Sequence, residues 1–190
     1  MDVFETIKTR RSIGKVKDEA PPKALIEKIL EAGTWAPSHH RTEPWKFIVL
    51  SGNARKRLGE VMAEALRDTL QDPDSQEAKA KLDSERGKPL RAPVIIALLV
   101  SPQDKPGVKA VEEYSSVAMA AQNMMLEAQS LGLATLLRTG DATYQKKVNQ
   151  FFKLKDPEYL FGFIYLGYSA MPAPPASSRV SFKEKTVWLE

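Results

Sequence analysis

Residues 93–100, "PVIIALLV", form a continuous apolar run that begins with a proline, and this run decides the fold class. An unbroken apolar run of this length is typical of a central strand that other parts of the chain cover on both faces. Further strands are expected where β-branched, aliphatic and aromatic residues gather, at "WKFIVLS" (45–51), "ATLLR" (134–138) and "YLFGFIYLGY" (159–168).

The helices expected around these strands follow from apolar residues at helical spacing. The segment "PPKALIEKILEAG" (21–33) has proline at its start, one apolar face and glycine at its end. The segment 111–132 is apolar on more than one side, which predicts burial in the core or against a second subunit. Shorter helices are expected over residues 2–7, 58–66 and 144–152. This order predicts an α/β layered domain in which helices cover a sheet.

The length of 190 residues predicts a single domain, residues 1–190. Residues 71–91 are highly charged, and we expect a surface excursion with some helix, either a solvated connector or a mobile lid. Residues 171–190 are rich in proline at their start and predict an extended C-terminal arm that ends in a short apolar strand. The arm and the helix with two apolar sides together indicate a dimer.

The composition excludes several classes of site. The chain has no cysteine and two histidines, so thiolate sites are impossible and no metal site is expected. It has 28 lysines and arginines against 24 acids, without a basic arm or nucleic-acid-binding motif, so no nucleic acid partner is expected. We see neither a signal peptide nor an apolar run long enough for a membrane, and we expect a cytoplasmic protein.

The stretch "KTRRSIG" (8–14) places two guanidinium groups and a hydroxyl next to one another, where a short helix is expected to end. A solvated basic patch is one interpretation of such an arginine pair. An oxyanion site is the other, because two guanidinium groups and a hydroxyl suit a phosphate.

A second stretch, "GTWAPSHHRTEPWKF" (33–47), gathers both histidines and two tryptophans between a helix and a strand. Together with the two segments "RRSIGK" and "QSLGLATLLRTGD", it resembles the nitroreductase family of FMN-dependent NAD(P)H oxidoreductases, and in particular the short branch of that family. The resemblance runs through essentially the whole chain. It implies an α/β (α+β) layered sandwich whose mixed, largely antiparallel central sheet is covered by helices.

The resemblance also implies which residues bind FMN. Arg10, Arg11 and Ser12 would hold the phosphate and ribityl chain, a role that suits their chemistry. A further basic group from the C-terminal arm is usual in the family, and either Arg179 or Lys183 could supply it.

Two more segments match positions that approach the flavin in this family. Trp35 and His39 would reach the flavin of the partner subunit. Leu137, Arg138 and Thr139 match the strand-end loop that lies near the redox-active nitrogen. A weaker match for the nicotinamide region is the helix end Glu127, Ala128, Gln129, Ser130, Leu131 and Gly132, which a glycine-capped helix also explains.

The function implied by the resemblance is a homodimer with two FMN sites at the subunit interface. NAD(P)H would reduce the flavin, and a nitroaromatic or quinone-like small molecule would then take the electrons. No side chain is expected to act as catalytic acid or base, because FMN carries the hydride. Two alternatives remain open: a non-catalytic FMN-binding or storage protein, and another flavin reaction such as dehalogenation or flavin fragmentation.

The chain departs from the family at one loop. Many members carry asparagine and glutamine before the Pro-Trp pair, where this chain has His39, His40 and Glu43. This difference concerns the choice of substrate more than flavin binding.

Overall fold

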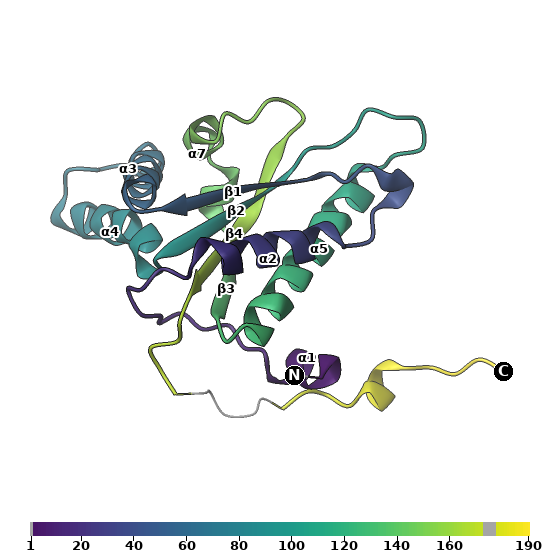
Figure 1. The fold of residues 1–190 in the computed structure, drawn as a ribbon. Helices are drawn as coiled ribbons and strands as arrows, with labels where there is room; N and C mark the ends of the chain where they lie inside the picture. Colours follow the sequence, from purple (N-terminus) through teal and green to yellow (C-terminus); the bar gives the residue numbers. More distant parts are fainter. Residues whose placement is uncertain (1, 173–177) are drawn as a thin grey trace.

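The computed structural model describes residues 2–172 and 178–190. Residues 173–177, part of the expected arm, lie outside the described residues. A four-stranded sheet forms the centre, with strands β1 (Trp45–Ser51), β2 (Val94–Val100), β3 (Ala134–Arg138) and β4 (Tyr159–Gly167) in the order β1-β2-β4-β3 (Figure 1). Each neighbouring pair is antiparallel. The layered fold and its largely antiparallel sheet are therefore confirmed.

Helices cover both faces of this sheet. Helices α2 (Lys23–Thr34) and α5 (Ala110–Ser130) pack on the face formed by alternate residues of β2 such as Ile96 and Leu98. On the other face, α3 (Asn53–Arg67) and α7 (Lys146–Phe151) pack against the residues between them, such as Ile95. All seven residues of β2 are buried, as the apolar run predicts.

A bulge in β4 changes which residues face each side of the sheet. The register with β2 shifts between Leu98 and Leu99, opposite Gly162. Because of this shift, Phe161 and Ile164 pack on the same face although they are three residues apart. A Cβ atom on Gly162 would lie 2.9 Å from the carbonyl oxygen of Arg138, so glycine lets the end of β3 come close.

The charged segment 71–91 is a packed helix rather than a loose excursion. Helix α4 (Gln76–Gly87) begins after Ser75, whose hydroxyl accepts a hydrogen bond from the backbone N–H of Ala78. It packs on α3 so closely that a Cβ atom on Gly59 would lie 2.2 Å from the carbonyl oxygen of Arg86. The short helix η2 (Lys88–Arg91) then leads into β2. The expectation of some helix is confirmed, and the choice between a connector and a lid stays a prediction.

The ends of the chain differ from the expected pattern in detail. Helix α1 (Val3–Thr9) is present. The helix expected over 144–152 is α7, which begins at Lys146 because the backbone of Gln145 is extended. A separate turn of helix, α6 (Asp141–Tyr144), precedes it. The short strand expected at the C-terminus is wrong. The described arm contains the single turn η3 (Phe182–Lys185), and Val187–Leu189 lie exposed without a strand to pair with.

No helix within residues 2–172 and 178–190 is long and apolar enough to cross a bilayer.

Candidate functional site

The Arg-Arg-Ser stretch runs along the open edge of β3. Ser12 forms a parallel bridge with Thr135, and the backbone N–H of Ile13 donates to the Thr135 carbonyl oxygen at 2.9 Å. Because Leu137 follows two residues later on the same strand, the fold brings two of the sequence-predicted segments to one edge of the sheet.

The guanidinium groups of Arg10 and Arg11 are partly buried without an acidic partner. Buried nitrogens Nη1 of Arg10 and Nε of Arg11 have no hydrogen-bond acceptor among the described residues, and no described carboxylate pairs with either side chain. Arg11 is held by donating from Nη1 to the carbonyl oxygens of Lys8 and Arg10, at 2.7 and 2.9 Å. Buried cationic donors without acceptors are costly, so this arrangement fits an anion.

A third guanidinium group comes from the C-terminal arm. The pKa of Arg10 is lowered by burial first, and then by the positive charges of Arg11 and Arg179. Of the two arm residues considered from the sequence, Arg179 is therefore the one whose charge reaches Arg10. The three guanidinium groups of Arg10, Arg11 and Arg179 are called the arginine cluster below.

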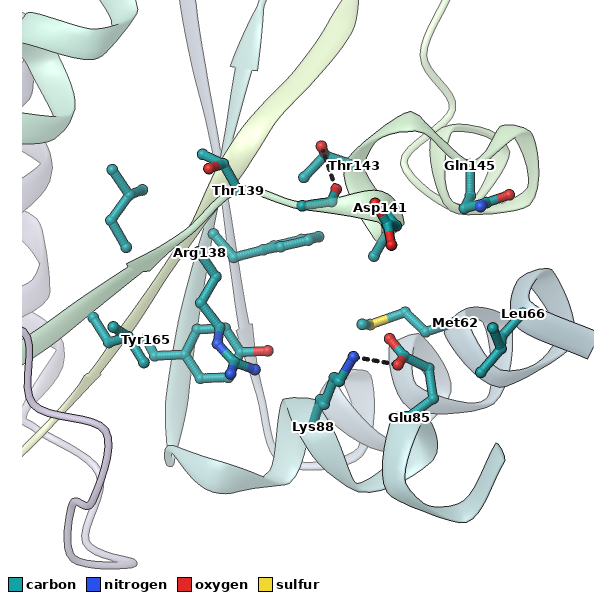
Figure 2. Close-up of a pocket in the computed structure, with 15 residues that line it drawn as sticks. Met62, Leu66, Glu85, Lys88, Arg138, Thr139, Asp141, Thr143, Gln145 and Tyr165 are labelled. Carbon is teal, nitrogen blue, oxygen red and sulfur yellow. Dashed lines mark hydrogen bonds and ion pairs between the residues drawn. The ribbon is translucent and has the colours of Figure 1, made fainter. Parts of the chain in front are cut away.

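A pocket of about 570 Å³ opens where β3 ends. Leu137, Arg138 and Thr139 line it, as do residues of α3, α4 and β4 (Figure 2). The guanidinium carbon of Arg138 lies 5.5 Å from the ring centre of Tyr165, a cation–π distance. Burial raises the pKa of Tyr165, so its hydroxyl stays protonated. The pocket therefore combines an aromatic wall with one guanidinium group, that of Arg138.

Sequence reasoning missed the charged residues that α4 and η2 bring to this pocket. Lys88 forms an ion pair with Glu85, and Asp141 lies across the pocket from them (Figure 2). The only available signal was the pair Ala78 and Leu82, whose helical spacing marks a buried face within an otherwise charged segment.

The loop with the two histidines is held at the other end of the molecule. His40, Arg41 and Glu43 have positive φ angles of 53°, 52° and 47°, a conformation that costs free energy in non-glycine residues. The Thr42 hydroxyl donates to the carboxylate of Glu113, which is fully buried.

Glu113 also accepts from the backbone N–H of Gln103 at 3.1 Å, so one carboxylate ties this loop to the start of α5 and to the loop after β2. The neighbouring residue Glu112 approaches His39, with 3.5 Å between its Oε2 and the imidazole Nε2. The loop is therefore fixed against the first turn of α5.

Within one chain, this loop and the arginine cluster are far apart. His39 approaches Glu112 at the beginning of α5, whereas the Arg-Arg-Ser stretch lies beside the strand that follows the end of α5. Glu112 and Ala128, 16 residues apart on that helix, are separated by about 24 Å. Trp35 also projects into solvent, with 78% of its surface exposed. One copy of the chain therefore does not bring His39 to the cluster, and it leaves the Trp35 side chain facing solvent.

The proposed nicotinamide region, residues 127–132, is the C-terminal end of α5. Gly132 has a φ of +75°, and the backbone N–H of Leu133 donates to the Ala128 carbonyl oxygen at 2.8 Å. This is a capped helix end that requires glycine. Contact with a nicotinamide stays a prediction.

Comparison with known proteins places this architecture in a family. The profile of the Nitroreductase family matches residues 7–168. The Escherichia coli K12 protein "Putative NAD(P)H nitroreductase YdjA" is 28% identical over 189 residues, covering 100% of this chain and 98% of its own length.

Solved structures agree over the full length. A nitroreductase-like family protein from Bacillus cereus superposes with a TM-score of 0.85 at 25% identity, covering 100% of this chain and 97% of that one. A nitroreductase with bound FMN from Bacteroides fragilis NCTC 9343 has a TM-score of 0.78 at 25% identity, with complete coverage of both chains. The match of the family profile to most of the chain shows that this protein belongs to the Nitroreductase family.

Proposed function

We propose that the protein is an FMN-dependent NAD(P)H oxidoreductase that reduces nitroaromatic or quinone-like acceptors by two electrons. The observation that carries this proposal is the arginine cluster, whose buried donors on Arg10 and Arg11 lack acceptors among the described residues. A phosphate monoester supplies the oxygens that such donors need, and guanidinium groups bind it in a fork geometry. Ser12 would donate a further hydrogen bond. The relative from Bacteroides fragilis, solved with FMN, supports the same assignment.

The isoalloxazine ring would occupy the pocket at the end of β3. Leu137 is an apolar residue of the pocket lining. Arg138 and Thr139 follow it in the chain and also line the pocket (Figure 2). Arg138 places a guanidinium group in the pocket, where electron density on a ring would be stabilised, whereas Lys88 is paired with Glu85. The pocket volume of about 570 Å³ lies in the range usual for cofactor sites.

We further propose that the working form is a homodimer in which each site uses both chains. His39 lies too far from the arginine cluster of its own chain to contact the same cofactor, and Trp35 faces solvent, so a second copy would bring both residues to the site. Two apolar surfaces support this arrangement. Helix α1 exposes Phe4 by 63%, and the arm exposes Trp188 by 81%. Large exposed apolar surfaces of this kind mark sites of protein association.

The chemistry would come from the bound FMN, which accepts a hydride from NAD(P)H and returns two electrons to the acceptor. The protein's own residues would bind and orient the cofactor. The arginine cluster would fix the phosphate, and Tyr165, with its pKa raised by burial, would remain neutral beside Arg138. No side chain is assigned as acid or base.

Steady-state kinetics under anaerobic conditions test the reaction type. We expect NAD(P)H oxidation that depends on an added nitroaromatic or quinone, with the parallel double-reciprocal lines of a ping-pong reaction. FMN binding without turnover on either donor would contradict the enzyme and favour a storage protein. Turnover only with a halogenated aromatic would instead favour dehalogenation.

A further inference from the structure

A second pocket, distinct from the one at the end of β3, gathers positive charge from three parts of the chain. Its volume is about 420 Å³, and it lies where the N-terminal segment, the start of α3 and η2 meet. Four cationic side chains line it, together with one acid, Asp18; the four cations are Lys17, Arg55, Lys56 and Arg91. The net formal charge of the lining is therefore +3.

The lining of this pocket carries more positive than negative charge within the part of the chain that the structure describes. Among the described residues, none of them forms an ion pair, although other lysines and arginines of the chain do, such as Lys81 with Glu77. Four like charges around one small pocket repel one another, and a bound anion would offset that repulsion.

Arg55 is the fixed member of the group. Its Nη1 donates to the carbonyl oxygen of Ala92 at 2.5 Å, which holds the guanidinium group against the beginning of β2. Its Nε is buried and has no acceptor among the described residues. The pocket wall therefore includes an orientated guanidinium group that retains unused donor capacity.

The backbone of α3 also contributes positive charge near this pocket. Arg55 and Lys56 belong to the first turn of α3, a helix of 15 residues whose N-cap, Gly52, has no side chain to satisfy the free N–H groups. The positive end of a helix dipole favours an anion at this position.

We propose that this pocket binds the phosphate group of a phosphorylated small molecule. The guanidinium and ammonium groups of the lining provide the donors and the charge that a phosphate monoester requires. The volume of about 420 Å³ exceeds the need of a single ion and falls in the range of small-molecule sites.

Two sources could present that phosphate, and the position of the pocket bears on both. Helix η2 joins the two pockets, because Lys88 lines the first and Arg91 lines the second. If the oxidoreductase function proposed above holds, the 2′-phosphate of NADPH is one source. A separate phosphorylated molecule is the other.

The test measures the melting temperature of the FMN-saturated protein in inorganic phosphate and in sodium chloride at equal ionic strength. Saturating FMN keeps the probe away from the arginine cluster. We expect phosphate to raise the melting temperature of the wild type by about 2–4 °C over chloride. The variant Lys17→Gln/Lys56→Gln should lose this rise, and neither side chain makes a hydrogen bond or ion pair among the described residues that its loss would break.

A matched control removes the same amount of charge elsewhere. Lys28 and Lys79 are exposed on α2 and α4, and Lys28→Gln/Lys79→Gln should keep the full rise. Equal responses of the two double variants, or no advantage of phosphate over chloride in the wild type, would overturn the proposal. A protein that fails to bind FMN would contradict the proposed function but would still report on this pocket through the difference between the two variants.

Kinetics with the two donors then identify the source. A KM for NADPH that rises about tenfold in Lys17→Gln/Lys56→Gln, with an unchanged KM for NADH, assigns the pocket to the 2′-phosphate. Unchanged KM values for both donors, together with loss of the phosphate-dependent melting shift, assign it to a separate phosphorylated molecule.

Discussion

The arginine cluster and the surface between α3 and α4 use the same side chain in opposite ways. Arg86 bridges Glu60 and Asp83, and the hydrogen bond to Glu60 is the first cause of its raised pKa. Arg10 has no acidic partner among the described residues, and its pKa is lowered by burial and by two other guanidinium groups. An arginine that stabilises the fold is paired within the chain, whereas an arginine kept for a ligand is left with unused donors.

The largest expected effect is on FMN affinity. Replacing Arg10 with alanine removes one charge-assisted contact, and we expect the dissociation constant to rise roughly ten- to a hundredfold, about 1.5–3 kcal/mol. The matched variant Arg86→Ala should bind as the wild type does. Fluorescence titration of the FMN-free proteins measures both. If Arg10→Ala and the wild type bind FMN with equal affinity, the assignment of the FMN phosphate to the arginine cluster is wrong.

The contribution of the arm should be smaller. Arg179→Gln removes a charge that reaches Arg10 from an exposed segment, so we expect FMN affinity to fall about three- to tenfold. Lys183→Gln is the control and should leave the affinity unchanged. The same titration distinguishes them, and a larger loss in Lys183→Gln would reassign the arm's basic group.

Stability without FMN should change in opposite directions at the two sites. Arg86→Gln breaks two surface ion pairs and should lower the free energy of unfolding by about 0.5–1 kcal/mol. Arg10→Gln relieves repulsion and should leave that free energy unchanged or raise it by a few tenths, about 0.3 kcal/mol. Urea denaturation of the FMN-free variants decides the matter. Similar losses in both variants would mean that Arg10 serves the fold.

Replacing the paired acid Glu158 should have a small effect on the free energy of unfolding, and this effect should depend on pH. Hydrogen bonds from Lys46, the Lys155 backbone and Ser101 lower the pKa of Glu158 from 4.5 to about 2. A carboxylate whose pKa is lowered by folding stabilises the protein when the pH is above its pKa in the unfolded state. This stabilisation is lost as the pH falls through its pKa in the folded state.

Glu158→Gln should therefore lower the free energy of unfolding by about 0.5 kcal/mol at pH 7, and the difference should fade between pH 4.5 and about 2. Urea denaturation at a series of pH values measures it. A difference that stays constant over this range would show that the carboxylate charge has no part in stability.

The sequence predicted the parts of the fold that depend on local pattern. The strand β2 could be predicted because burial on both faces gives an unbroken apolar run, and α2 because burial of one face gives apolar residues at helical spacing. The bulge beside Gly162 in β4 could not be predicted, since it depends on how β4 pairs with β2. The terminal segment around Trp188 reads as an apolar strand, but a strand also needs a neighbouring edge, which no local pattern reveals.

The candidate site divides in the same way. Arg10, Arg11 and Ser12 stand together in the chain, so their shared chemistry could be recognised directly. Arg179 and Lys88 reach the site only through the path of the arm and the packing of α4. Residues brought together by tertiary packing carry no mark in the sequence, which is why Lys88 was missed.

The most direct test of the central claim is the visible absorption spectrum of the purified protein before and after anaerobic addition of NADPH. We predict that the protein shows a bound-flavin spectrum and that this spectrum bleaches on addition of the donor. On dilution, the Arg10→Ala variant should release FMN more readily than the Arg86→Ala variant. A colourless protein that takes up no added FMN would contradict this account, and the arginine cluster would then be a solvated basic patch.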